Sequence, residues 1–159
     1  MELVSYPNGK GYEKAHPHVL LWSPKNTTEK TTANLTHTAM NTTENNALVE
    51  RHLEIWNERD QAKRNAIISQ VYATGIEMVD RHFIATGHAE VVGFINNLQQ
   101  KNPGYRFKHV KQIDTHHNIA RLYWQFGSEA KPGVVTGMDL FVIENGKVQK
   151  LYVFVDQPE

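Results

Sequence analysis

Apolar residues recur at helical spacing in three separate stretches of the chain. Their inward-facing positions are Leu48, Val49, His52, Leu53 and Trp56 after a helix cap at Asn41; Ile67, Ile68 and Val71 within residues 61–72; and Val91, Phe94, Ile95 and Leu98 after Gly87. Gly75 is predicted to end the second helix, and Pro103-Gly104 to end the third. The pattern therefore predicts three helices, each with one apolar face.

The other patterned stretches indicate strands. Two short extended pieces are expected at residues 76–80 and 81–86, and four longer strands at residues 105–114, 119–126, 134–143 and 148–155. Asn145-Gly146 between the last two is a strong signal for a tight hairpin. Helices followed by a run of antiparallel strands predict an α+β fold, with three N-terminal helices packed on one face of a curved antiparallel sheet.

The hairpin also predicts which side chains share a face. A two-residue turn pairs Glu144 with Lys147, and an unbroken ladder then sets Asp139 opposite Tyr152 and Gly137 opposite Phe154. We expect the Asp139 side of the sheet to line a pocket. The opposite, aliphatic side is expected to be a dimer interface or core, and the reverse assignment stays open at this stage.

The first part of the chain differs from the rest. Residues 1–43 are rich in Pro, Gly, Thr and Asn, and such a composition buries too little apolar surface to offset chain entropy. We interpret 1–43 as a flexible N-terminal extension and 44–159 as the single compact domain. Translation could also begin at Met40. Three Asn-x-Thr sequons, at Asn26, Asn34 and Asn41, are attributed to this composition rather than to glycosylation.

Composition and charge exclude several classes of protein. The chain has 17 basic and 17 acidic residues, no cysteine and no Lys/Arg-rich run, which argues against nucleic-acid binding and thiolate metal sites. No apolar run approaches the ~20 residues that cross a bilayer, and no secretory leader is recognisable. Membrane association is therefore not expected, and cytoplasmic is the default location. His116-His117 lies in a predicted turn and is not taken as a metal site.

Several short motifs together resemble one known family. These are Val79-Asp80-Arg81-His82-Phe83, Gly87-His88-Ala89-Glu90, Pro103-Gly104-Tyr105-Arg106-Phe107, Asp114-Thr115-His116-His117, Tyr123-Trp124-Gln125-Phe126, Gly137-Met138-Asp139 and Phe154-Val155-Asp156. Their order resembles the SnoaL-like members of the NTF2-like superfamily over about residues 44–156. The resemblance implies a cone-shaped half-barrel around one pocket, often dimeric through its sheet. The family includes cyclases, isomerases, dehydratases and epoxide hydrolases as well as non-enzymes, so the fold implies a pocket rather than a reaction.

Asp139 is the leading candidate for chemistry. Apolar and aromatic neighbours would desolvate its carboxyl group, which could then act as a general base. The alternative is a buried Asp that only accepts hydrogen bonds. Tyr152 is a candidate hydrogen-bond donor, with a core position as the alternative. Asp80 and His82, two residues apart on an extended backbone, are a candidate second polar pair, with a polar rim at a strand end as the alternative. The predicted pocket wall consists of Trp56, Tyr72, Trp124, Phe141 and Phe154.

Two functions fit these residues. The first is a cofactor-free, metal-free acid–base enzyme acting on a small, largely apolar molecule by isomerisation, cyclisation, dehydration or epoxide opening. The second is a non-catalytic module that binds a ligand or a protein through the same pocket. The sequence names neither a substrate nor a pathway.

Overall fold

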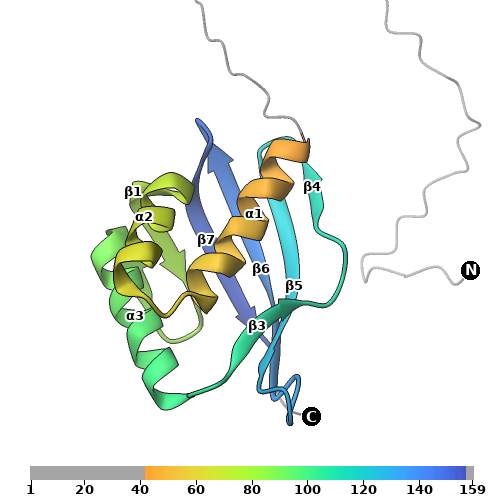
Figure 1. The fold of residues 1–159 in the computed structure, drawn as a ribbon. Helices are drawn as coiled ribbons and strands as arrows, with labels where there is room; N and C mark the ends of the chain where they lie inside the picture. The colour runs from red at the N-terminus through yellow and green to blue at the C-terminus, as the bar shows by residue number, and fades with distance from the viewer. Residues whose placement is uncertain (1–41, 157–159) are drawn as a thin grey trace, which may run out of the picture. The chain divides into compact units, whose positions relative to one another are not determined.

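The computed structural model describes residues 42–156, which form three helices and one seven-stranded sheet (Figure 1). In chain order the elements are α1 (Thr42–Asn57), α2 (Gln61–Val71), β1 (Tyr72–Val79), β2 (Ile84–Thr86), α3 (Gly87–Lys101), β3 (Arg106–His109), β4 (Asp114–His116), β5 (Ile119–Gly127), β6 (Val135–Glu144) and β7 (Lys147–Val155). Residues 1–41 of the predicted extension, with Met40 and the asparagines of the three sequons, lie outside the described part. Among the described residues, no helix is long and apolar enough to cross a membrane.

The sheet is mixed rather than antiparallel throughout. The strand order is β2-β1-β7-β6-β5-β3, with β4 also paired to β5, and β1 runs parallel to β7. The prediction of a purely antiparallel sheet is therefore wrong at this one junction. Hydrophobic alternation marks where strands lie, but it carries no information about the direction of two strands more than 60 residues apart.

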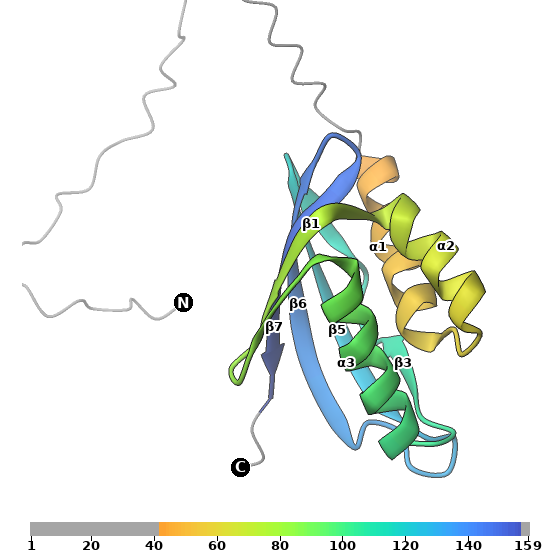
Figure 2. The same cartoon turned by 90° about the vertical axis from the view of Figure 1, so that its left-hand side faces the viewer.

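The three helices lie on one side of the sheet (Figure 2). Each turns its predicted apolar face inward: Val49 of α1, Ile68 of α2 and Ile95 of α3 have at most 1% of their surface exposed. They meet sheet residues such as Phe141, which is fully buried. Burial of these faces is the main force that holds the helical layer on the sheet.

The second helix is shorter than the sequence pattern suggests. It ends at Val71, and Tyr72 already has the extended backbone angles φ −101° and ψ 143°. Gly75, the predicted breaker, lies inside β1. Tyr72 is 1% exposed as the first residue of β1, so its burial in the sheet overrides the continuation of the helical pattern.

The predicted strand at residues 105–114 is also divided. β3 and β4 both pair with β5 in antiparallel fashion. Residues 110–113 between them belong to neither strand, and Val110 N donates a hydrogen bond to Tyr123 O at 2.9 Å. The edge of β3 is closed by a side chain, because the Asn57 amide accepts from Phe107 N at 2.8 Å and donates to Phe107 O at 2.9 Å. This pairing fixes the end of α1 against the sheet.

The β6–β7 hairpin contains a one-residue irregularity that changes the predicted faces. Asn145 (φ 52°) and Gly146 (φ 73°) form the expected tight turn, and Glu144 pairs with Lys147 and Ile143 with Val148. The next pair is Val142 with Lys150, so the register shifts by one and Asp139 faces Val153 instead of Tyr152. Because side chains alternate along a strand, the extra residue turns every later side chain of β7 to the other face.

A buried arginine links the α1–α2 connection to α3. Arg64, 1% exposed, donates through Nη1 to Glu58 O at 2.9 Å and to Gln99 Oε1 at 3.0 Å, and through Nη2 to Asn96 Oδ1. Gln99 in turn donates to Trp56 O at 3.0 Å. The last turn of α1, which carries Trp56, is thereby held against α3.

Candidate functional site

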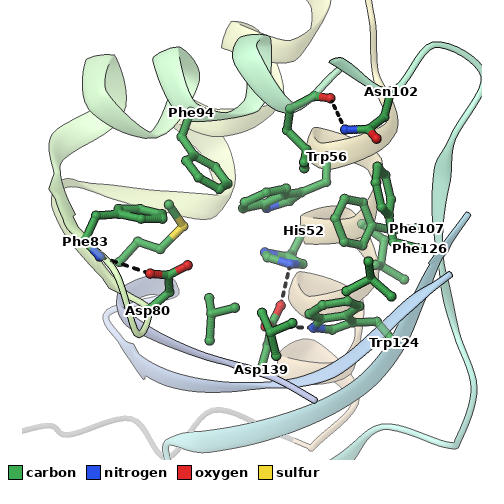
Figure 3. Close-up of a pocket in the computed structure, with 16 residues that line it drawn as sticks. His52, Trp56, Asp80, Phe83, Phe94, Asn102, Phe107, Trp124, Phe126 and Asp139 are labelled. Carbon is green, nitrogen blue, oxygen red and sulfur yellow. Dashed lines mark hydrogen bonds and ion pairs between the residues drawn. The ribbon is translucent and has the colours of Figure 1, made fainter. Parts of the chain in front are cut away.

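A cavity of about 200 Å³ lies between the helices and the sheet (Figure 3). Most of its wall is apolar or aromatic, and the polar residues in the wall are His52, Asp80, Asn102 and Asp139. The full lining consists of His52, Leu53, Trp56, Met78, Asp80, Phe83, Phe94, Leu98, Asn102, Phe107, Trp124, Phe126, Val135, Asp139, Val153 and Val155. Val135 and Val155 are also exposed, so the cavity reaches the surface near the start of β6 and the end of β7.

Asp139 is the buried acid of this cavity. It is 4% exposed, and its carboxylate contacts two nitrogen groups from different elements. Trp124 Nε1 on β5 donates to Oδ1 at 2.8 Å, and His52 Nε2 on α1 lies 3.2 Å from Oδ2. A carboxylate that accepts from both sides is held in one orientation, and each oxygen keeps a further lone pair for a ligand.

The other nitrogen of His52 is bound as well. Nδ1 lies 2.7 Å from the hydroxyl oxygen of Tyr72, and Trp56 Nε1 donates to the same oxygen at 3.1 Å. The indole N–H can only donate, so the Tyr72 hydroxyl is free to donate its own hydrogen to Nδ1. In that arrangement Nδ1 of His52 accepts, and Nε2 carries the hydrogen that points to Asp139.

Burial affects the ionisation of Tyr72 most strongly. Its side chain is 1% exposed, and desolvation raises the pKa of the phenol far above its ordinary value. The hydrogen bond from Trp56 opposes this shift, while the negative charge of Asp139 adds to it. Tyr72 therefore stays a neutral phenol in the folded protein at physiological pH.

Asp80 and His82 both lie in the turn between β1 and β2. Asp80 lines the cavity, and its Oδ1 accepts from His82 N at 2.6 Å and from Phe83 N at 3.0 Å. The His82 side chain is exposed and does not line the cavity. The expectation that both side chains share one face of a strand is wrong, because Asp80 caps a turn and the backbone at His82 is not extended.

The register shift moves two further candidates away from the cavity. Tyr152 pairs with Leu140, and Phe154 pairs with Met138 and is 57% exposed, so both lie on the face opposite to Asp139. Their predicted positions in the site are wrong. Trp56 and Trp124 do line the cavity, Tyr72 lies behind His52, and Phe141 packs its ring edge-on to His52 at 4.8 Å between centroids.

Sequence reasoning did not assign a role to His52. The residue is 2% exposed and appears in the sequence as one position of the apolar face of the first helix. A titratable residue among Leu48, Val49 and Leu53 was the available signal, because such a side chain needs a buried polar partner. The partner, Asp139, is 87 residues away in the chain and could not be identified from the helix alone.

The fold and the cavity together define a class of protein: a curved sheet covered on one side by three helices, with one mainly apolar pocket between the two layers. Solved structures share this architecture. A proposed isomerase of the SnoaL-like family from Agrobacterium tumefaciens str. C58 matches with a TM-score of 0.67 and 28% identity, over 72% of this chain and 99% of its own. A proposed SnoaL-like polyketide cyclase from Jannaschia sp. CCS1 matches with a TM-score of 0.60 and 16% identity, over 72% and 86%.

A proposed ketosteroid isomerase from Kribbella flavida DSM 17836 has a TM-score of 0.58 and 13% identity, over 74% of this chain and 81% of its own. No protein-family model matches the chain, and no curated protein matches its sequence significantly. The structural matches support the resemblance found in the sequence. The chain has the fold of the NTF2-like superfamily and is similar to its SnoaL-like proteins.

Proposed function

We propose that this protein is a cofactor-free acid–base catalyst that removes a proton from a small, largely apolar molecule, with Asp139 as the general base. The observation that carries the proposal is the carboxylate of Asp139, buried in the wall of an apolar cavity and held by Trp124 and His52. The structural similarity to proposed isomerases and cyclases supports the same type of chemistry.

The geometry suits a proton transfer from carbon. A substrate C–H bond would break, its proton would form an O–H bond on Asp139, and the electron pair would remain on the substrate. A preoriented general base contributes on the order of 10² to 10⁴ in rate. His52 and Trp124 are positioning residues in this scheme, since both donate to the carboxylate. Tyr152 and His82 do not line the cavity and have no role in this scheme.

The test begins with ligands, because the substrate is not yet identified. A thermal-shift screen of apolar ketones, phenols, sterols and terpene epoxides should find compounds that raise the melting temperature; a ligand at a hundred times its Kd adds about 2.7 kcal/mol. Ketones that bind are then incubated with the protein in D₂O, and exchange of the hydrogens next to the carbonyl is followed by NMR. We expect the wild-type protein to accelerate the exchange, and Asp139→Asn to lose at least about 100-fold of this acceleration.

Asp114→Asn is the matched control. Asp114 is an exposed acid on β4 that pairs with Arg121 at 2.6 Å and does not line the cavity. This variant should exchange at the wild-type rate. If Asp139→Asn still accelerates the exchange at the wild-type rate, with an unchanged melting temperature, Asp139 is not the general base.

The alternative is a non-catalytic module that binds a ligand in the same cavity. A specific observation favours it: the indole and imidazole N–H groups of the wall all donate to protein acceptors, as they would in a purely structural network. If bound ketones never exchange faster than in buffer, this binding function replaces the catalytic one.

We also propose that two copies associate through the face of the sheet that the helices leave open. Met138, Leu140 and Val142 of β6 lie on this face together with Tyr152 and the exposed Phe154 of β7. Apolar side chains on an unoccupied sheet face are typical of an interface between identical subunits. The molar mass in solution, measured by light scattering, tests this.

A further inference from the structure

Six of the side chains that line the cavity form one continuous aromatic wall. Each ring contacts the next, and the last two both contact Phe107. The centroid distances are 4.4 Å for Phe83–Phe94, 5.8 Å for Phe94–Trp56, 5.4 Å for Trp56–Phe107, 5.3 Å for Phe107–Trp124 and 4.4 Å for Phe107–Phe126. Figure 3 shows these rings around the cavity, contributed by both layers of the fold. A ligand in this space therefore meets aromatic carbon on several sides.

A carboxylate stands next to each end of the aromatic wall. Asp80 accepts a hydrogen bond from the backbone nitrogen of Phe83 at 3.0 Å, and Asp139 accepts one from the indole of Trp124 at 2.8 Å. Among the described residues that line the cavity there is no Lys or Arg. The described lining of the site thus combines aromatic faces with two acids and holds neither Lys nor Arg.

The carboxylate of Asp139 has no Lys or Arg partner among the described residues that line the cavity. Its two side-chain partners are the indole of Trp124 and the ring of His52, which is a neutral imidazole when the Tyr72 hydroxyl donates to Nδ1. Trp124 supplies a dipole and no charge. A buried carboxylate that is hydrogen-bonded but has no positive partner attracts a cationic ligand group and repels an anionic one.

We propose that the ligand of this cavity is an organic cation, an amine or quaternary ammonium compound with an apolar body. Aromatic faces bind such cations through the ring quadrupole, and desolvation strengthens the attraction. The inference rests on the pocket of the proposed function and narrows its substrate class. It also fits the chemistry, because a positive charge beside the reacting carbon would stabilise the electron pair left when Asp139 takes the proton.

Three probes of similar shape test the charge preference. Phenyltrimethylammonium, tert-butylbenzene and benzenesulfonate each carry one ring and one tetrahedral substituent, with charges of plus one, zero and minus one. Their dissociation constants are measured by ligand-observed NMR with the full-length protein. We expect the cation to bind at least about ten-fold more tightly than the neutral compound, and the anion not to bind.

Variants assign the preference to the acids. Asp139→Asn should reduce the ten-fold preference to about two-fold or less, and Asp80→Asn should reduce it partly, while both still bind the neutral compound. Asp114→Asn should behave as the wild type. Asp80→Asn also serves as the reporter if Asp139→Asn fails to fold, because the Asp80 carboxyl group lies at a surface turn.

Failure of this inference is distinguishable from failure of the proposed function. Equal affinity for the cation and the neutral compound, tighter binding of the anion, or no binding of any probe would overturn the cation site. None of these outcomes bears on the role of Asp139 as a base, which the exchange experiment with ketones tests separately. Conversely, the protein could prefer the cation through Asp139 and yet catalyse no hydrogen exchange. That result would support organic cations as the ligands of a non-catalytic binding protein.

Discussion

His52 on α1 and Asp139 on β6 meet across the two layers of the fold, with Nε2 3.2 Å from Oδ2. Both side chains are almost fully buried, and both line the same cavity. The contact therefore links the position of the first helix to the orientation of the proposed base.

Replacing His52 by Gln should weaken catalysis more than binding. The amide of Gln can still donate to Asp139, but it lacks the ring that the Tyr72 hydroxyl orients, so the carboxylate is held less well. We expect the rate of hydrogen exchange in a bound ketone to fall about 10- to 100-fold while the Kd changes less than about three-fold. NMR titration and exchange on the same sample measure both. An equal loss in Kd and rate would instead indicate that His52 only shapes the cavity.

Removing the hydroxyl of Tyr72 should destabilise the fold. Tyr72→Phe leaves Trp56 Nε1 and His52 Nδ1 without their shared partner inside the protein. An unsatisfied buried polar group costs about 1–3 kcal/mol, which urea unfolding at pH 7 can measure. Tyr123→Phe is the control, because Tyr123 is only half-buried on the helix-free face. Equal stability of the two variants would contradict the network.

The contribution of Tyr72 should also depend on alkaline pH. Burial raises its pKa above the ordinary value of about 10, so the folded state holds the phenol proton more tightly than the unfolded state. This stabilisation is fully present below pH 10 and is lost as the pH rises above 10 towards the folded pKa. Between pH 9 and pH 11 the difference in unfolding free energy between wild type and Tyr72→Phe should shrink by about 1 kcal/mol. A constant difference would mean that Tyr72 ionises equally in both states.

Gly137 gives a prediction about the wall of the cavity. A Cβ atom at this position would collide with the carbonyl oxygen of Phe154 and with the ring of Trp124. Gly137→Ala should therefore cost about 1–3 kcal/mol and displace Trp124 from Asp139, which changes the indole fluorescence. Gly93→Ala is the matched control, since nothing lies within 4 Å of its added Cβ on the exposed side of α3. An unchanged melting temperature in Gly137→Ala would contradict the tight packing.

The open face of the sheet predicts the behaviour of two charged variants. Leu140→Glu and Phe154→Glu introduce a charge among the apolar residues of this face, and both should shift the molar mass from dimer to monomer. Ile84→Glu, at a residue 63% exposed on β2, should leave the mass unchanged. A wild-type protein that is monomeric at micromolar concentration would overturn the dimer.

Much of the architecture was predictable because it depends on local patterns. The apolar face from Leu48 to Trp56, the helix after Gly87 and the Asn145-Gly146 hairpin all lie within single stretches of chain, where spacing and turn chemistry determine the local structure. The alternation along β6 predicted which residues share a face with Asp139, and the irregularity in the neighbouring strand does not change this; the choice between the two faces stayed open until the structure placed Asp139 in the cavity.

The errors come from interactions between distant or irregular parts. One extra residue at Gln149 turned Tyr152 and Phe154 to the opposite face, and a turn capped by Asp80 removed His82 from the site. Neither feature has a periodic signature. Both alter side-chain direction without altering the hydrophobic pattern from which faces are predicted.

The sequence by itself determined the α+β class, the number and order of the helices, the final hairpin and the resemblance to SnoaL-like proteins, because these depend on local propensity and on the order of motifs. Only the tertiary structure brought His52, Tyr72, Trp124 and Asp139 together from four separate elements, and only it set β1 parallel to β7. The physical reason is that buried polar groups must find partners wherever packing brings them. That choice is made by the whole fold and leaves no mark in any one stretch of the chain.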